Sequence, residues 1–378
     1  METLFSANGL LFGTIVPFLF VLTVVVFVHE MGHYLVGRWC GIGVEAFSIG
    51  FGPELLGFND RTGTRWKLSA IPLGGYVKFL GDANAASAPD FEGAEAMTEE
   101  EREGSFVHKR VGQRAAVVVA GPVANFILAI VIFSLIFMTF GRFVADPVVG
   151  SVDPGMPAAE AGIMPGDVIL SANGTKVENF VDLQRVVAPS AGREVDIVVR
   201  RDGKELTFTL QPRMKERVDR FGNKQELSVI GIQSSADAGS SRVERAGPVE
   251  AVGYAVSETW FIVSSTISYL GDIVTGRQST DQLGGPIRIA KVSGEVATLG
   301  PVALLNLAAV LSVSIGLLNL FPIPLLDGGH LVFYAIEAIR GRPLGEAAQE
   351  IGYRIGLALV LLLMFFATFN DITQIFLS

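Results

Sequence analysis

Four long runs of uncharged, mostly apolar residues constrain this chain more than any other feature of its sequence. They cover 10–28, with 19 residues, 115–141 and 300–326, with 27 residues each, and 355–370, with 16 residues. About 20 apolar residues cross the hydrocarbon core of a bilayer as an α-helix, so we expect the fourth run to extend past Asp371. The chain is therefore predicted to be a polytopic α-helical membrane protein with about four transmembrane helices.

The composition agrees with a membrane protein and argues against one class of partner. Mean hydropathy is +0.47, and only 18% of the residues are charged. The net charge of -9 is a poor background for a phosphate-binding surface, so we expect membrane lipid as the surroundings and no nucleic acid. No Lys or Arg precedes Arg38. The first run therefore lacks the basic segment of a cleaved signal peptide and is expected to remain as a helix.

Lysines and arginines predict the orientation of the chain in the membrane. Nine of them lie between Arg38 and Arg114, three lie between Arg340 and Arg354, and none precedes or follows these two loops except in the long region 142–299. Short basic loops face the cytoplasm, whereas long translocated regions largely escape this rule. We therefore expect both termini and the central region outside the cytoplasm, in a multi-pass protein of the bacterial inner membrane.

The same patterns predict the order of the parts. Short strands punctuated by Gly and Pro, an acidic stretch at 82–105 and a strand-rich region after the second run separate the apolar segments. We expect a first transmembrane helix at 1–37, a cytoplasmic, membrane-associated β region at 38–114 with a mobile acidic loop, a second transmembrane helix at 115–143, an extracytoplasmic α+β unit at 147–212, an extracytoplasmic linker at 213–298 with a short interfacial helix near 259–271, a third transmembrane helix at 299–330, a cytoplasmic loop at 331–354 and a fourth transmembrane helix at 355–376.

The sequence HEMGH at 29–33 places three ionisable side chains at the end of the first apolar run. His29 and His33 are four residues apart and share one face of a helix, and Glu30 lies beside them. This is the H-E-x-x-H pattern of a metal site, in which the carboxylate takes a proton from a metal-bound water as the water attacks a carbonyl. Coincidence is a weak alternative, because a charge at membrane depth costs on the order of 2.5 kcal/mol or more.

A catalytic zinc takes three protein ligands and keeps one open position. The third run ends in NLFPIPLLDGGH, which brings Asp327 and His330 to a membrane boundary. Pro322 and Pro324 are expected to break the helix there, which is tolerated at depth only where the backbone lines a cavity or is buried in protein. Asp327 also fits the N-cap of a helix starting at Gly328. Spacing alone does not choose between Asp327 and His330 as the third ligand.

HEMGH at 29–33 together with NLFPIPLLDGG at 319–329 resembles the site-2 protease family of intramembrane zinc metalloproteases. The four runs and the central unit are similar to its bacterial branch, that of the regulator of sigma-E protease. The resemblance implies one Zn²⁺ per chain, held by His29, His33 and Asp327. It also implies that Glu30 is the catalytic carboxylate and that His330 lies near the metal.

Three further segments match motifs of this family. Asn319 corresponds to an asparagine that holds substrate near the metal, with an interhelical hydrogen bond or a helix end as the alternative. GPVAN at 121–125 matches a motif of the second span, in which we expect Asn125 to make a structural polar contact near the site or, as the weaker alternative, to touch substrate. AIPLGGYVKF at 70–79, with Gly74, Gly75 and Tyr76, resembles a membrane-dipping hairpin whose strand edge receives the unwound substrate.

The central unit contains PAAEAGIMPGDVILSANG at 157–174, which resembles the PDZ domains of bacterial periplasmic proteases. The resemblance implies an open groove in which backbone N–H groups at Val149, Gly150 and Ser151 bind an extended peptide or its C-terminal carboxylate. The alternative is a closed spacer that only restricts access. The sequence holds one such unit, whereas some relatives of this branch carry two.

We therefore expect an inner-membrane zinc endopeptidase that cleaves transmembrane segments of single-span proteins, with its active site near the cytoplasmic side. The resemblance implies anti-sigma factors already trimmed outside the membrane, as in the sigma-E stress response, and remnant signal peptides. A catalytically inactive membrane scaffold would be expected to lose Glu30 or a ligand. A metal transporter would spread its ligands along a path across the membrane. The sequence disfavours both alternatives.

Overall fold

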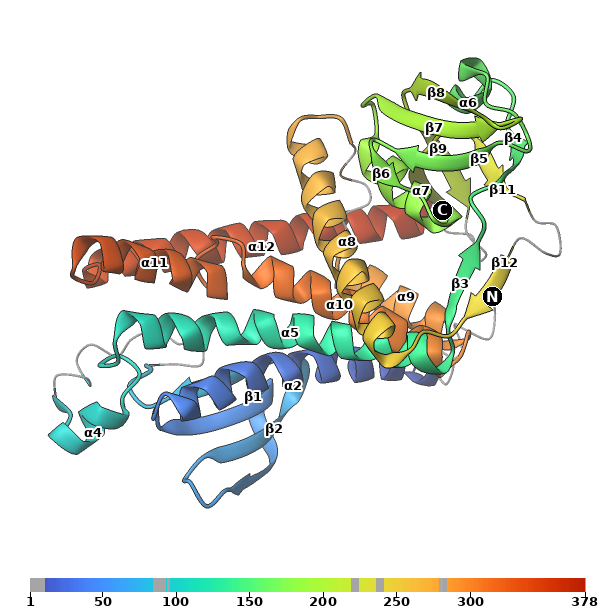
Figure 1. The fold of residues 1–378 in the computed structure, drawn as a ribbon. Coiled ribbons are helices and arrows are strands. Elements are labelled where there is room, and N and C mark those ends of the chain that lie inside the picture. The colour runs from blue at the N-terminus through green and yellow to red at the C-terminus, as the bar shows by residue number, and fades with distance from the viewer. Residues whose placement is uncertain are drawn as a thin grey trace. The chain divides into compact units, whose positions relative to one another are not determined.

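The structure is a computed structural model, which describes residues 11–83, 93, 96–218, 224–235, 241–278, 280 and 284–377. The chain divides into two compact units (Figure 1). The first comprises Met1–Ile132 and Gly284–Leu377, and the second comprises Phe133–Leu283. The long helix α5 (Val111–Thr139) belongs to both, because its last residues lie past the division.

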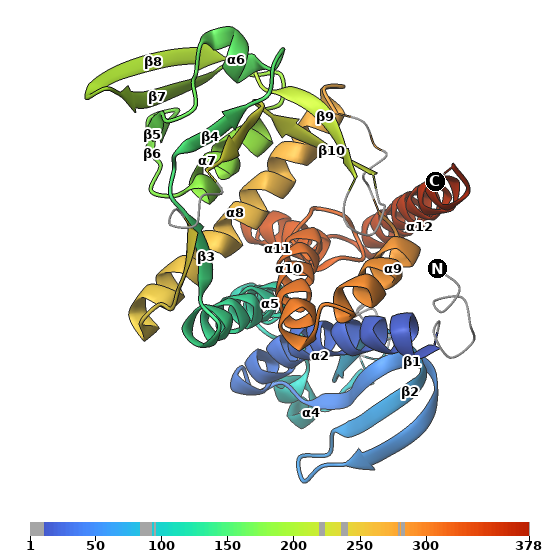
Figure 2. The same cartoon turned by 90° about the vertical axis from the view of Figure 1, so that its right-hand side faces the viewer.

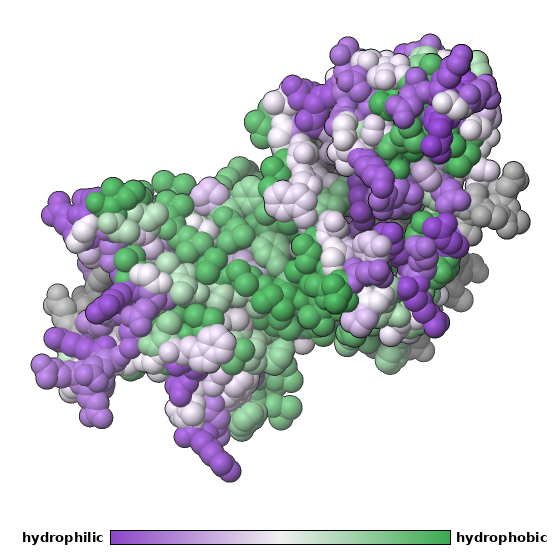
Figure 3. Space-filling view, in the orientation of Figure 1, coloured by the Kyte–Doolittle hydropathy of each residue, from purple (hydrophilic) through white to green (hydrophobic). Residues whose placement is uncertain are grey.

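Four helices of the described part of the chain are long and apolar enough to cross a membrane, which confirms the predicted number of long apolar helices. Apolar side chains cover the surface over these helices, whereas polar side chains gather around the short helix α4 (Glu99–Gly104) (Figure 3). The four helices are α2 (Val16–Trp39, preceded by the π-helical turn η1, Leu11–Ile15), α5, α10 (Pro301–Asn319) and α12 (Glu346–Leu377).

The third apolar run does not form one helix. Helix α10 ends at Asn319, and α11 (Asp327–Arg340) follows after a turn that contains both prolines, as their lack of a backbone N–H predicts. The expected loop at 331–354 is wrong, because α11 continues to Arg340 and α12 already begins at Glu346. Helix α11 ends where Gly341 adopts a φ of 70°, a conformation that favours glycine.

A long antiparallel hairpin packs against α2 in the first unit. It consists of β1 (Val44–Asn59) and β2 (Arg65–Phe79). At its turn, the carboxylate of Asp60 accepts hydrogen bonds from the backbone of Thr62 and Thr64 and from the indole of Trp66. The hairpin thereby keeps β2 extended alongside the helix that carries HEMGH.

The acidic stretch was expected to be a mobile loop, and its last part is instead helical. Thr98 and Glu101 form a reciprocal capping box that starts α4. Residues 84–92, 94 and 95 of this stretch lie outside the described residues. Helix α9 (Pro286–Ala297), which also belongs to the first unit, is held at its start by Asp371 of α12, whose carboxylate accepts from the backbone N–H groups of Gly285 and Arg288.

The second unit is built around a four-stranded sheet in the order β6-β5-β7-β8 (Figure 2). Short helices and further strands complete the unit. The elements are β3 (Arg142–Ala145), β4 (Val149–Val152), α6 (Pro157–Ala161), β5 (Val168–Ala172), β6 (Thr175–Lys176), α7 (Phe180–Val187), η2 (Ala188–Ser190), β7 (Val195–Arg201), β8 (Lys204–Leu210), β9 (Arg213–Val218), β10 (Lys224–Val229), β11 (Ile232–Ser234), β12 (Ser241–Glu244) and α8 (Pro248–Val274).

The boundary expected at residue 212 is too early. Strand β11 pairs antiparallel with β4, and Ile230 belongs to the same buried core as Val149 and Ile169. Residues after 212 therefore complete the fold of this unit. The short strands that they form have no helical period, so the sequence did not indicate that they belong to the same core.

The groove predicted beside Val149, Gly150 and Ser151 is bordered on one side of β4 by another strand of the chain. Ser151 pairs with Gln233 and Val149 with Ser234, so the chain's own β11 occupies this edge. On the other side of β4, the backbone N–H of Val149 donates to the backbone carbonyl oxygen of Asp167. A peptide cannot add to the edge of β4 that pairs with β11 without displacing β11.

Helix α8 is longer than the short helix expected near 259–271. It has 27 residues and begins at Pro248, where proline is favoured because the first helical N–H has no partner. Glu258, just before the expected start, lies inside the helix and forms an ion pair with Arg185. The acidic residue therefore does not end the helix, because its charge is compensated within the second unit.

Candidate metal centre

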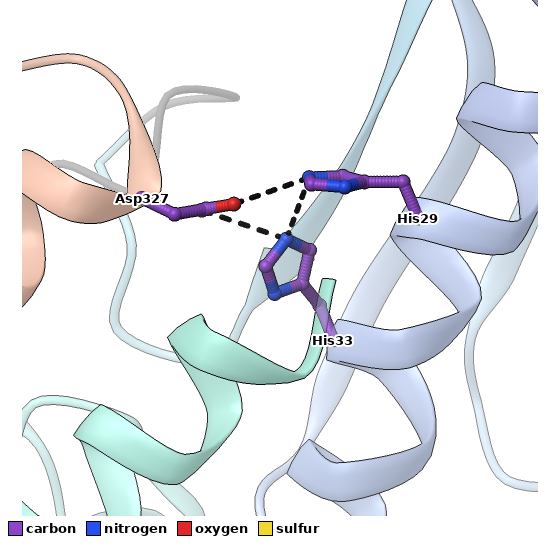
Figure 4. A group of neighbouring side chains, drawn as sticks. All are labelled: His29, His33 and Asp327. Atoms are coloured by element: carbon purple, nitrogen blue, oxygen red, sulfur yellow. Dashed lines mark hydrogen bonds and ion pairs between the residues drawn. The ribbon is translucent and has the colours of Figure 1, made fainter. Parts of the chain in front are cut away.

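Helix α2 places His29 and His33 on one face, as their spacing predicts. Both side chains are buried, and their Nε2 atoms lie 3.2 Å apart. Figure 4 shows the two rings turned toward the same point, which the side chain of Asp327 reaches from the start of α11. Nε2 of His29 lies 3.2 Å from Oδ2 of Asp327, and Nε2 of His33 lies 3.5 Å from Oδ1.

The turn between α10 and α11 delivers Asp327 to this point. Leu325 has a φ of 88°, although it is not a glycine. Gly328 and Gly329 lie so close to the backbone of Leu320 and Ile323 that a β-carbon at either position would collide with it. Helix α11 starts at Asp327 itself, and Leu326 is the N-cap residue. The alternative in which Asp327 caps a helix from Gly328 is therefore wrong.

His330 is buried but lies outside the group of ligand atoms. Its ring packs at a centroid distance of 5.7 Å from Tyr353 and 6.5 Å from Tyr334. The three side chains whose ligand atoms lie within 4.8 Å of one another are His29, His33 and Asp327. Between the two candidates that the spacing left open, the geometry therefore favours Asp327 as the third ligand.

Helix α5 packs directly against the imidazole rings of the two histidines. A β-carbon at Gly121 would collide with the imidazole of His33 and lie 2.9 Å from Cε1 of His29. A β-carbon at Gly32 would collide with the carbonyl oxygen of Ala120, so α2 and α5 cross in close contact here. The motif GPVAN singled out this segment, but nothing in the sequence indicated that Gly121 lies under the histidine rings.

Glu30 lies on α2 next to strand β2. Its carboxylate lies near the backbone of Val77. A β-carbon at Gly75 would lie 3.1 Å from Cγ of Glu30, so this glycine permits the close approach of strand and helix. Of the residues expected in the hairpin, Gly75 therefore lies against Glu30, with Gly74 and Tyr76 on either side of it in β2. Asn319 is the last residue of α10.

The three ligand candidates fit a zinc ion. Oδ2 of Asp327 is buried and has no hydrogen-bond partner among the described residues, despite its contact with His29. Buried polar atoms without partners are costly, and a cation between the carboxylate and the two facing imidazoles would remove that cost. Two imidazoles and one carboxylate are a ligand set of catalytic zinc, which keeps a fourth position open.

Comparison with known proteins identifies the family. The model of peptidase family M50 matches residues 17–363, a range that includes all three ligand candidates and Glu30. The chain belongs to peptidase family M50. This is the site-2 protease family to which HEMGH and LLDGG point, and that prediction is confirmed.

Relatives of this M50 protein match over nearly their whole length. A protein of Agrobacterium fabrum that carries the provisional name of a zinc metalloprotease is 56% identical over 375 residues, which are 99% of this chain and 100% of the relative. The metalloprotease MmpA of Caulobacter vibrioides is 44% identical over 382 residues, 95% of each chain. The regulator of sigma-E protease RseP of Escherichia coli is 32% identical over 455 residues, 95% of this chain and 98% of the relative.

Among solved structures, the PDZ domain of an SdrC-like protein from Listeria monocytogenes is similar to part of this chain. The similarity covers 24% of this chain and 87% of the PDZ domain, at 22% identity and a TM-score of 0.19. Membership of M50 confirms the predicted enzyme class, a zinc metalloprotease.

Proposed function

We propose that this M50 protein is an intramembrane endopeptidase with one zinc ion per chain, which cleaves transmembrane segments of single-span membrane proteins. The observation that carries the proposal is the convergence of His29, His33 and Asp327 at a buried point beside helices that are long and apolar enough to span a membrane. When bound there, the zinc ion would polarise the scissile carbonyl and lower the pKa of a water molecule.

The residues of the chain supply the rest of the chemistry. Glu30 follows His29 directly on α2, so its carboxylate lies beside the ligand group and can take a proton from the attacking water. The protonated side chain then donates that proton to the leaving amine. Gly75 of β2 lies against the side chain of Glu30, which ties the position of this carboxylate to the strand.

Strand β2 supports a role for the hairpin in holding substrate. A peptide bond within a helix is shielded by the helix's own hydrogen bonds, so a transmembrane segment must become extended before it is attacked. The strand segment of Gly74, Gly75 and Tyr76 runs past Glu30, and an extended substrate pairing with it would bring its backbone to the ligand group. Asn319, where α10 ends, is proposed to bind the same segment.

The wider setting is also a proposal. Membership of M50, with RseP among the relatives, and four apolar helices support an inner-membrane protein whose termini and second unit are extracytoplasmic, and whose site lies near the cytoplasmic side. Anti-sigma factors trimmed outside the membrane and remnant signal peptides are the proposed substrates. Since β11 occupies the edge of β4, we propose that the second unit, of PDZ type, selects substrates by the size of their soluble parts.

The test uses model substrates reconstituted with the purified protein in detergent. Each has one apolar span, either with a Gly-Pro pair at its centre or with leucines there, and either with or without a folded extracytoplasmic domain. We expect cleavage inside the span, mapped by mass spectrometry, fastest for the trimmed substrate with the Gly-Pro pair. Cuts confined to soluble loops, or equal rates for the helical and the interrupted spans, would contradict the proposal.

A further inference from the structure

The two histidines that face Asp327 are both held at their far nitrogen by α5. Nδ1 of His33 lies 2.9 Å from the carbonyl oxygen of Val117. A carbonyl oxygen only accepts, so Nδ1 of His33 carries the proton and donates it. In a neutral imidazole the other nitrogen then has a free lone pair, so Nε2 of His33 is ready to bind a metal ion.

His29 has an equivalent contact, two turns further along α5. Its Nδ1 lies 3.3 Å from the side-chain amide of Asn125. For Nε2 of His29 to bind a metal ion, Nδ1 must carry the proton and needs an acceptor. Only the oxygen of an amide group accepts, so Oδ1 of Asn125 has to face His29.

The surroundings of Asn125 agree with this orientation. The residue is fully buried, and its Oδ1 has no hydrogen-bond donor in the described residues when Nδ2 faces His29. Turning the amide by half a rotation, which leaves its shape unchanged, gives Oδ1 the proton of His29 as its donor. The turned amide is the orientation that leaves Nε2 of His29 free to bind a metal ion, because Nδ1 then carries the proton.

Helix α10 fixes the backbone of Asn125. The hydroxyl of Ser312 donates to the carbonyl oxygen of Asn125 over 2.8 Å. A β-carbon at Gly316 would lie 3.1 Å from the β-carbon of Asn125, so α10 backs this residue closely. A buried side chain enclosed in this way is not available to a substrate, which removes that alternative for Asn125.

We propose that Asn125 is a positioning residue for the metal centre: its amide oxygen accepts the Nδ1 proton of His29 and thereby turns Nε2 toward the metal ion. The proposal rests on the proposed metal site. In it, Asn125 strengthens zinc binding and takes no part in proton transfer. Partners that hold the far nitrogen of a ligating histidine contribute about 10–100-fold to metal affinity.

The test is zinc affinity measured by competition with a chromophoric chelator on full-length protein in detergent. Asn125→Leu keeps the approximate volume but offers no acceptor, so we expect about 10–100-fold weaker zinc binding. Asn125→Asp keeps an oxygen in the same place and should bind zinc within a few-fold of the unmodified protein. Ser134→Ala removes another buried polar group from the same helix and should leave affinity unchanged.

Circular dichroism of the metal-free variants separates unfolding from loss of the site, because a folded Asn125→Leu variant keeps its helical signal. Unchanged zinc affinity of folded Asn125→Leu, or an equal loss in Asn125→Asp, would overturn this inference and leave the proposed function standing. Failure of the unmodified protein to bind zinc would instead contradict the proposed metal site itself.

Discussion

Gly121 of α5 lies directly beneath the imidazole of His33, so close that a β-carbon on the glycine would collide with Nε2 of the ring. The neighbouring backbone is helical, so neither partner can move away cheaply. Absence of a side chain at Gly121 is therefore a condition for placing His29 and His33, the two candidate ligands, at the crossing of α2 and α5.

Replacing Gly121 by alanine should displace His33 and lower zinc affinity by about 100-fold or more. This loss exceeds that expected when a hydrogen-bond partner of a ligating histidine is removed. Chelator competition measures this change. Gly112 is the matched control, because it lies on the same helix and a β-carbon there would meet nothing within 4 Å. A Gly121→Ala variant that binds zinc as tightly as Gly112→Ala would show that the crossing tolerates a side chain.

Asp327 and His330 should differ sharply when each is replaced. Asp327→Ala removes the carboxylate whose two oxygens lie 3.2 Å from His29 and 3.5 Å from His33, so zinc content of the purified protein should fall to near zero. His330→Gln removes a ring that packs against Tyr334 and Tyr353 outside the group of ligand atoms and should retain zinc. Inductively coupled plasma mass spectrometry gives both values. Zinc lost on replacing His330 but kept on replacing Asp327 would reverse the ligand assignment.

The strained turn before Asp327 predicts an unusual tolerance of glycine. Leu325 has a φ of 88°, which costs a residue with a β-carbon roughly 1–2 kcal/mol and costs glycine little. Leu325→Gly should therefore keep zinc affinity. Leu325→Ile adds a branch at the strained position, and roughly 1 kcal/mol of extra strain would weaken zinc binding about 5-fold.

Leu320→Ile is the control for this substitution, since Leu320 has an ordinary φ of -82° at the end of the preceding helix. Equal zinc affinity of Leu325→Ile and Leu320→Ile would mean that the backbone of the turn adjusts and does not position Asp327.

The second unit should lose stability in acid through one buried ion pair. Nε of Arg201 lies 2.6 Å from Oδ1 of Asp167, whose side chain is 1% exposed. Burial alone would raise the pKa of Asp167, but hydrogen bonds from Arg201 and from the backbone of Met164 hold this pKa below its ordinary value. The stabilisation is therefore present above about pH 4, near the pKa of the unfolded chain, and disappears as the pH falls through the lower folded-state pKa.

Asp167→Asn should lower the local free energy of unfolding at pH 7 by about 3 kcal/mol, because the guanidinium loses its charged partner. Hydrogen–deuterium exchange of peptides from β5 and β7 in the full-length protein measures the difference, which should shrink in acid. Asp153→Asn breaks a more exposed pair with Lys215 and should lower stability much less than Asp167→Asn. A difference for Asp167→Asn that does not depend on pH would refute the assignment.

Much of the site was predictable because its information is local. The spacing of HEMGH puts both histidines on one helical face, and two prolines predict the break in the helix before Asp327. That Asp327 reaches His29 across about 300 residues depends on tertiary packing, and only the resemblance to a family indicated it.

Other features had no local signal in the sequence. The pairing of β11 with β4 depends on backbone hydrogen bonds between segments about 80 residues apart, which no periodicity specifies. The carbonyl oxygen of Val117 contacts His33 regardless of the side chain at that position. Helix α8 begins well before the expected residue 259, and the ion pair of its Glu258 with Arg185 depends on the fold and has no local signal in the sequence.

The central claim is that Glu30 carries protons in a zinc-dependent cleavage within a membrane segment. The most direct measurement compares the unmodified protein with Glu30→Gln, recording bound zinc and cleavage of a transmembrane peptide in detergent. The amide cannot take a proton from water, so we expect unchanged zinc content and a rate lowered by about 10²–10⁴-fold. Undiminished cleavage by Glu30→Gln, or zinc bound to both proteins with no cleavage by either, would contradict the account.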